Sequence, residues 1–251
     1  MSPAWMNKPL RGLTLSLLGC ALVAVFSVGC GKASDFEEEE GDGVPVTELT
    51  EQERHELELF AEPKMTADEE AFALKKYEHV DPHGVVPRGL LKKALTYYDS
   101  NRVLLKNDLV LTVVDFSARS SRARMYIVDM ISGTVEKYHV AHGKGSDPRN
   151  TGYASRFSNR PNSHRSSLGF YRTAETYMSP KHGLALRLDG LSPTNSNVRK
   201  RAIVLHGATY VHDRDIKQGR SSGCFAVSDA MHEKVVNRLR KGSIIFAGLS
   251  R

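Results

Sequence analysis

From residue 109 onward, apolar residues come in short runs of five or six, separated by segments rich in glycine, serine and asparagine. The runs predict strands at Leu109–Val114, Met125–Asp129, Val135–Val140, Leu168–Arg172, Leu184–Leu188, Ala202–His206 and Ser243–Ala247. Gly133 lies between the second and third runs and indicates a hairpin there. Strands this short and this regularly spaced predict a mainly β fold, either a β-sandwich or a partly closed barrel, with a few appended helices.

Three helices are predicted beside these strands. Thr66 and Glu69 fit a capping box, in which the Thr66 hydroxyl accepts a backbone N–H and Glu69 reaches back to the cap, so a short helix should follow. Pro87 opens a second helix, and its apolar side chains share one face: Leu90, Leu91, Ala94, Leu95 and Tyr98. Ser228 is the predicted N-cap of a last helix, which ends before Gly242.

Charge divides the 251-residue chain, although the formal net charge is only +6. Residues 35–70 hold fifteen acidic residues against two basic ones, whereas residues 71–251 hold thirty basic and fourteen acidic residues. Residues 31–64 are acidic and poor in large apolar side chains, so they predict a flexible linker. A helical lead-in over 65–101 and a β-rich domain over 102–251 follow. The 40% of hydrophobic residues excludes a chain that is disordered throughout.

Residues 1–30 have the pattern of an export signal. Two basic residues precede an uncharged run, Leu13–Val28, and small residues follow it. This run of 16 residues is shorter than the roughly 20 that span a bilayer. Cys30 is the candidate for lipidation, Cys20 is an alternative, and an uncleaved anchor helix is a third interpretation. We predict no nucleic-acid partner, because the chain lacks an aromatic-rich strand motif and a helix-turn-helix.

His206 and Cys224 are the candidate catalytic residues. His206 ends a predicted strand, and Cys224 follows eighteen residues later in a turn beside Gly223. An imidazole near a thiol can take its proton and create a thiolate nucleophile, while the N–H groups of Gly223 and Cys224 are suited to an oxyanion hole. Arg220 suits a substrate that carries carboxylates. At this point, a buried structural cysteine and a core histidine explain the same residues equally well.

A metal site is a weaker interpretation of the same region. His206, His212 and Cys224 would be its ligands, but they lack a paired-cysteine or HExxH spacing. The segment 143–146 is rich in glycine but lacks the full phosphate-loop pattern. We therefore predict neither a metal nor a cofactor.

Several stretches of the chain match one family in their residues. They are His206-Gly207, Ser222-Gly223-Cys224, Val140–Gly143, Phe157–Asn159, Ser166–Phe170 and Arg201–Ala208. Together they make residues 100–248 resemble the catalytic domain of bacterial peptidoglycan L,D-transpeptidases. The resemblance implies an L,D-transpeptidase-like, predominantly β catalytic domain over 102–251. It also implies that Cys224 is the nucleophile and that His206 is the general base, oriented by a backbone carbonyl.

The reaction that the resemblance implies is acyl transfer in two steps. The cysteine forms a thioester with a tetrapeptide stem of peptidoglycan and expels the terminal D-alanine, and an amine acceptor then resolves the thioester. The expected substrate contacts are Arg220, Ser222, Gly207 and His142. Two positions depart from the family pattern, because Ser222 replaces a histidine and Phe225-Ala226 replaces an aliphatic residue followed by arginine.

Two other functions stay open at this point. If water instead of an amine resolved the thioester at the same site, the protein would be an L,D-carboxypeptidase or endopeptidase. Because Ser222 replaces the family histidine, a catalytically inactive wall-binding module is a second alternative. The expected location is the periplasm or cell envelope, with a lipid or membrane anchor at the N-terminus. Peptidoglycan stem peptides carry carboxylates, which a basic domain attracts.

Overall fold

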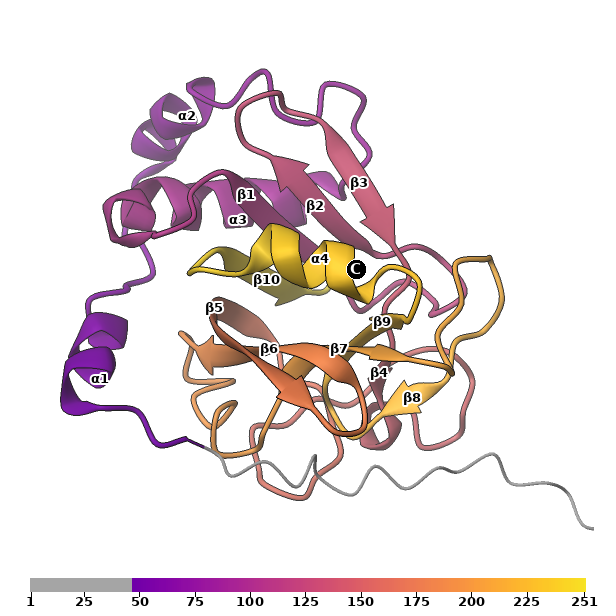
Figure 1. Cartoon of the computed structure of the whole chain (residues 1–251). Helices are drawn as coiled ribbons and strands as arrows, with labels where there is room; N and C mark the ends of the chain where they lie inside the picture. Colours follow the sequence, from indigo (N-terminus) through magenta and orange to yellow (C-terminus); the bar gives the residue numbers. More distant parts are fainter. Residues whose placement is uncertain (1–46) are drawn as a thin grey trace, which may run out of the picture. The chain divides into compact units, whose positions relative to one another are not determined.

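The computed structural model describes residues 47–251, so the predicted signal segment, Cys20, Cys30 and the first part of the predicted linker lie outside the described residues. The helices are α1 (Glu51–Glu58), α2 (Ala67–Lys75), α3 (Arg88–Asn101) and α4 (His232–Leu239), with 3₁₀ turns at Arg102–Leu104 and Lys144–Ser146. The strands are β1 (Val110–Asp115), β2 (Met125–Asp129), β3 (Val135–Tyr138), β4 (His142–Gly143), β5 (Gly169–Ser179), β6 (Gly183–Gly190), β7 (Val204–Ala208), β8 (Arg220–Ser221), β9 (Phe225–Ser228) and β10 (Ile244–Gly248). Figure 1 shows their arrangement.

Eight of the strands form one curved sheet in the order β3-β2-β1-β10-β5-β6-β7-β9, and β4 and β8 form a second, two-stranded sheet. The pairs β1–β10 and β7–β9 are parallel, while the other pairs in the large sheet are antiparallel. The chain just after β3 returns to β9, where the Ala141 N–H donates to the Ala226 carbonyl at 2.8 Å. The sheet is therefore a nearly closed, barrel-like structure, which confirms the predicted fold class.

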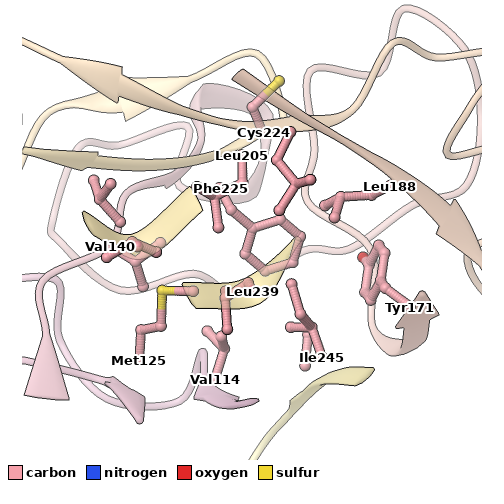
Figure 2. Close-up of a cluster of buried hydrophobic side chains, with 14 of the residues drawn as sticks. Val114, Met125, Val140, Tyr171, Leu188, Leu205, Cys224, Phe225, Leu239 and Ile245 are labelled. Carbon is pink, nitrogen blue, oxygen red and sulfur yellow. The ribbon is translucent and has the colours of Figure 1, made fainter. Parts of the chain in front are cut away.

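The central strands are buried on both faces. On β1, Val110 and Val114 pack in the interior cluster with Ile245 of β10, whereas Leu111 and Val113 face α3 on the outside. Because neither face meets water, β1 is apolar at four of its six positions, the exceptions being Thr112 and Asp115, and it lacks the regular alternation of a half-exposed strand. The interior cluster, drawn in Figure 2, also takes side chains from α4 and from β5, β6, β7 and β9.

Most predicted elements form close to their expected positions, including the hairpin of β2 and β3 and the helices α2 and α3. β5 is longer than predicted. Its second half is largely polar and its register shifts between Thr173 and Thr176, so that half has no apolar run from which a strand could be predicted. β4, β8 and β9 were not predicted. The predicted cap at Ser228 is wrong, since Ser228 ends β9 and donates its hydroxyl to Asp213 at 2.6 Å, and α4 begins only at His232.

The predicted flexible linker over 31–64 needs correction in the part that the structure describes. Thr50 and Glu53 form a capping box for α1, and Glu56 pairs with Lys106 and Arg172 of the domain at 3.3 and 3.2 Å. Phe60 is 8% exposed. Basic side chains of the domain compensate the acidic charge of α1, and the buried ring of Phe60 attaches its C-terminal end, so residues 51–60 are ordered rather than flexible.

Candidate active site

Two neighbouring strands bring His206 and Cys224 into one region. β7 and β9 run parallel, with Leu205 opposite Phe225 and His206 opposite Ala226. Leu205 and Phe225 share the interior face of the sheet. Because side chains alternate along a strand, His206 faces the other way. Cys224 immediately precedes β9, and Figure 2 shows its sulfur at the margin of the cluster, directed away from the Phe225 ring.

The cysteine is buried, at 9% exposure, yet its thiol has a polar neighbour. The Sγ atom lies 3.7 Å from the carbonyl oxygen of Ala202, which is a contact that a thiol proton can make. The thiol is therefore at the boundary between the apolar interior and the polar segment that precedes β7.

The turn that carries the cysteine is held by one hydroxyl. Ser221 Oγ donates to the Cys224 carbonyl at 2.8 Å and accepts the Gly223 N–H at 3.0 Å. Gly223 has φ +127°, and a Cβ there would lie 2.9 Å from the Arg165 carbonyl oxygen, so only glycine fits without strain. The Gly223 N–H, one of the two amides expected in an oxyanion hole, is bonded inside the turn in this structure.

The geometry of His206 fixes its tautomer. Its Nδ1 lies 2.8 Å from the Gly207 carbonyl oxygen. A carbonyl can only accept, so Nδ1 carries the proton and Nε2 keeps a lone pair. The resemblance implies a histidine oriented by a backbone carbonyl, and Gly207 provides that carbonyl.

Gly207 itself is buried behind the histidine. A Cβ on Gly207 would lie 2.7 Å from Asp229 Oδ1 and 2.7 Å from the His232 ring. This close approach explains why a glycine follows His206. The sequence predicts a substrate contact at Gly207, which stays a prediction, and the structure places this glycine against Asp229 and His232.

Arg201 is a residue at the site that the sequence analysis did not single out. Its guanidinium donates to the carbonyls of Ser158, at 2.8 Å, and of Arg165, and it has no carboxylate partner among residues 47–251. Burial lowers the pKa of Arg201, and the ionisable groups of Tyr171 and Cys224 act in the opposite direction. A positive charge beside a thiol favours the thiolate. The only sequence signal for Arg201 is that a basic residue lies just before a predicted apolar strand.

Behind the cysteine turn lies a buried polar network built on His142, Arg124 and Asp147. His142 is fully buried, and its Nδ1 accepts from Arg124 at 2.7 Å, so its Nε2 carries the proton and faces Asp147 at 3.6 Å. Arg124 also donates to the carbonyls of Val140 and Ala118, at 2.9 and 2.8 Å. The substrate contact expected at His142 stays a prediction, and the structure places its ring inside this network at 0% exposure.

The charges of this network are set by burial. Burial lowers the pKa of Arg124 to about 9. Burial, and then the adjacent Arg124 charge, lower the pKa of His142 to about 3, so this imidazole is neutral. Burial alone would raise the pKa of Asp147, but N–H groups of Thr151 and Gly152 hold that pKa below its usual value.

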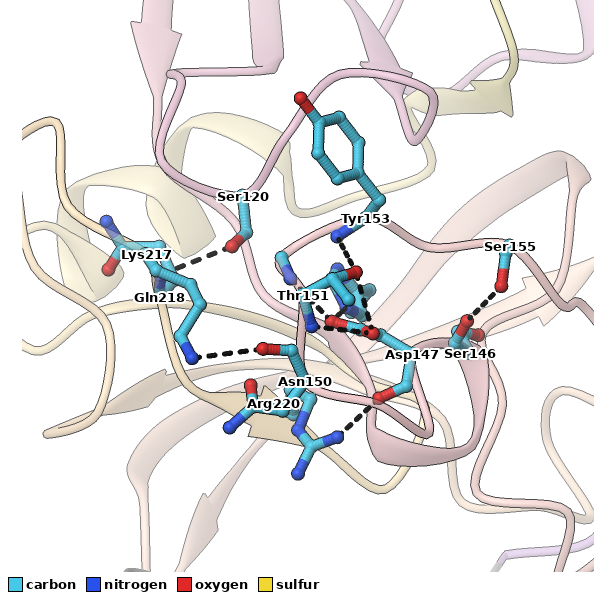
Figure 3. A network of polar contacts seen from close by, with 12 residues as sticks. Ser120, Ser146, Asp147, Asn150, Thr151, Tyr153, Ser155, Lys217, Gln218 and Arg220 are labelled. Carbon is cyan, nitrogen blue, oxygen red and sulfur yellow. Dashed lines mark hydrogen bonds and ion pairs between the residues drawn. The ribbon is translucent and has the colours of Figure 1, made fainter.

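The network is connected to the cysteine turn through β4 and β8. His142 is opposite Arg220, and Gly143 is opposite Ser221. The Arg220 guanidinium donates to the Asp147 carbonyl, as Figure 3 shows, so at least one of its N–H groups supports the loop that follows β4. Ser222, the last of the predicted substrate contacts, lies half-buried between Ser221 and Gly223.

The ligands of the metal interpretation do not form a site. His212 is exposed, whereas His206 and Cys224 are buried. Within the described residues, no group of three histidine, cysteine, aspartate or glutamate side chains is arranged to hold a metal ion.

Comparison with known proteins places this domain in a family. The profile of the L,D-transpeptidase catalytic domain matches residues 84–247. Similar solved structures include an L,D-transpeptidase from Mycobacterium smegmatis, with 14% identity and a TM-score of 0.36 over 56% of this chain and 58% of that chain. Bd1075 from Bdellovibrio bacteriovorus has 15% identity and a TM-score of 0.34, over 56% of this chain and 47% of that chain.

An L,D-transpeptidase from Xylanimonas cellulosilytica has 12% identity and a TM-score of 0.31, over 55% of this chain and 60% of that chain. The chain thus spans less than two thirds of each of these structures. No match was found among curated proteins. The family profile matches well over half of the chain, and on that ground the chain belongs to the L,D-transpeptidase catalytic-domain family.

Proposed function

We propose that this protein is a peptidoglycan L,D-transpeptidase that uses Cys224 as nucleophile and His206 as general base. The observation that carries the proposal is the tautomer of His206. Its Nδ1 is bonded to the Gly207 carbonyl, which leaves the Nε2 lone pair to accept a thiol proton. Cys224, which immediately precedes the adjoining strand β9, is the only cysteine within the described residues.

In the first step, His206 Nε2 takes the thiol proton, and the thiolate attacks the carbonyl carbon of the third residue of a tetrapeptide stem. The bond from that carbon to the nitrogen of the terminal D-alanine then breaks, and the imidazolium returns the proton to the leaving amine. In the second step, an acceptor amine attacks the thioester, and the thiol is restored as the new amide bond forms.

The remaining residues have proposed roles around this chemistry. The amides of Gly223 and Cys224 would stabilise the developing oxyanion, which requires the Gly223 N–H to leave Ser221. Arg201 would favour the thiolate. Arg220 and Ser222 are the proposed substrate contacts, of which Arg220 is suited to a carboxylate.

The proposed location is the cell envelope, because the substrate of the reaction is the cell wall. Residues 71–251 carry thirty basic against fourteen acidic residues, and this charge would attract the carboxylates of stem peptides. Export, and a lipid anchor at Cys30 or Cys20, remain proposals from the sequence. Between residues 47 and 251, no helix has the length and apolar character to cross a membrane.

The test is to incubate the full chain with a tetrapeptide muropeptide and to measure covalent adducts and products by mass spectrometry. We expect an adduct on the Cys224 peptide with loss of D-alanine, and cross-linked dimers when an amine acceptor is present. Cys224→Ser and His206→Ala should lose adduct and dimers, while His212→Ala, which changes an exposed histidine, should keep both.

Each other outcome contradicts the proposal in a defined way. If Cys224→Ser formed the adduct in undiminished yield, Cys224 would not be the nucleophile. Trimmed monomers without dimers would identify a carboxypeptidase. Binding to purified sacculi with neither adduct nor product would identify an inactive wall-binding module.

A further inference from the structure

A second imidazole lies against the proposed base. The ring centroids of His182 and His206 are 4.0 Å apart, and the ring planes are inclined by 41°. His182 is half-buried, whereas His206 is 1% exposed. His182 therefore contacts the His206 ring from the solvent side of an almost fully buried residue.

The hairpin between β5 and β6 holds His182 in place. Ser179 ends β5 and Gly183 begins β6, and these two residues are directly opposite each other. Ser179 Oγ accepts the N–H groups of Lys181 and His182 at 3.3 and 3.2 Å, and Gly183 makes the turn with φ +66°. Both backbone bonds restrict the turn, so the ring has a defined position rather than that of a mobile loop residue.

We propose that His182 is a positioning residue that acts through His206, a role that rests on the proposed function of His206 as the base. The tilted His182 ring packs against the His206 imidazole and restricts its rotation, in addition to the hydrogen bond that His206 Nδ1 donates to the Gly207 carbonyl. When His206 takes the thiol proton, the face of a neutral His182 ring stabilises the imidazolium as a cation–π partner. A protonated His182 would repel it.

The departure at Ser222 agrees with this role. The resemblance expects an imidazole two positions before the cysteine, where this chain has Ser222. His182 brings an imidazole to the base from a different part of the sheet.

Other charged or titratable groups lie near this pair and enter its pH dependence. His232 of α4 lies behind Gly207, and its Nε2 is 3.7 Å from the position of a Cβ on Gly183. Asp229, just before α4, approaches Gly207 from the same side. Lys181 precedes His182 in the turn and is exposed. Each His182 variant below therefore changes that residue alone and leaves all of these groups in place.

The test measures the rate at which iodoacetamide alkylates Cys224 in the full chain, read from the mass of the Cys224 peptide between pH 5 and pH 9. His182→Ala should lower the rate at neutral pH by about three- to tenfold. His182→Phe keeps a ring face but cannot take a proton, so it should restore most of the rate and flatten the acid side of the profile. Lys181→Ala and Met178→Ala change exposed side chains of the same hairpin and should stay within about twofold.

An unchanged rate and pH profile in His182→Ala would overturn the inference, and so would a His182→Phe variant no faster than His182→Ala. If His182→Ala does not fold, His182→Gln replaces it: a rate below that of His182→Phe supports the role, and equal rates overturn it. His206→Ala separates the two proposals. If that variant alkylates as fast as the unaltered protein, the proposed function fails, whereas a slow His206→Ala beside a normal His182→Ala removes only the present inference.

Discussion

Two regions of the sheet are stabilised by different means. On the outside of β1, β10 and β5, aromatic rings pack under α3, with Tyr97 stacked on Phe170 at 3.7 Å and Phe170 on Phe246 at 4.5 Å. Around β4 and β8, the buried groups are instead mainly polar, with Arg124 and His142 as the central pair.

We infer that the aromatic region mainly determines the stability of the fold, whereas the polar region mainly determines the position of the cysteine turn. The free energy gained by burying apolar side chains is roughly proportional to the buried area and changes little when the side chains shift slightly. The aromatic region therefore stabilises the fold without fixing any atom closely. Buried polar groups are costly unless each one is paired, so the polar region accepts few geometries. We infer that the polar region holds the cysteine turn in place. The four predictions below test this separation.

The largest expected effect on stability is in the aromatic region. Phe170→Ala removes a ring that stacks on both Tyr97 and Phe246, and it should lower the free energy of unfolding by about 4 kcal/mol. Urea unfolding measures this, and Phe72→Ala, at a side chain 70% exposed, should stay within about 0.5 kcal/mol. If the folded Phe170→Ala protein also lost the alkylation rate of Cys224, the two regions would not be separable.

A slightly smaller loss should follow from Arg124→Met, but with a second consequence. The carbonyls of Val140 and Ala118 and the ring of His142 would lose their donor, at a cost of about 3 kcal/mol. In contrast to Phe170→Ala, this variant should also slow alkylation of Cys224. The matched control is Arg122→Met, whose side chain is 74% exposed. A destabilised Arg124→Met protein with a normal thiol would contradict the positional role.

His142→Gln should change how stability depends on pH. The folded pKa of His142 is about 3, below that of an unfolded histidine near 6.5. Below pH 6.5 the unfolded chain therefore binds a proton that the folded chain does not, and stability falls with the pH. At pH 5 this lowers the free energy of unfolding by on the order of 2 kcal/mol. The His142→Gln protein should not show this loss between pH 7 and pH 5.

Urea unfolding of both proteins at the two pH values gives the comparison, with His83→Gln as the control at an exposed histidine. An equal loss of stability in His142→Gln and in the unaltered protein would mean that His142 is not kept neutral by the network.

The smallest effect concerns the two capping boxes. Thr66→Ala should cost about 1 kcal/mol, because α2 buries Ala73 and its first turn depends on the cap. Thr50→Ala should cost less, because α1 buries no residue and can fray without loss of packing. Thermal unfolding of both variants tests the ranking, and equal losses would show that α1 is as firmly attached as α2.

The elements that local patterns encode could be predicted from the sequence. The hairpin of β2 and β3 follows from two apolar runs around Gly133, and α2 follows from the Thr66–Glu69 box. The His206 and Cys224 pair was found because its spacing matches a family motif. Strands β4 and β8 have two residues each, so neither contains a pattern to detect.

Contacts between distant segments could not be predicted in the same way. The order of α1 depends on Arg172 and Lys106, which follow it by more than 40 residues. His182 lies 24 residues before His206, and the sheet alone brings their rings together. Arg124 and His142 likewise become partners only when the sheet closes. A single sequence contains no characteristic spacing for such pairs, because the long-range pairing of strands determines which residues meet.

The bond from Ala141 to Ala226 also bears on solubility. A strand whose outer N–H and C=O groups are unpaired is a template for a foreign strand and hence for aggregation. β9 is the last strand of the sheet, but it has only four residues, and the carbonyl of Ala226 is already taken. The strand that follows the cysteine is thereby protected from edge-to-edge association between copies of the protein.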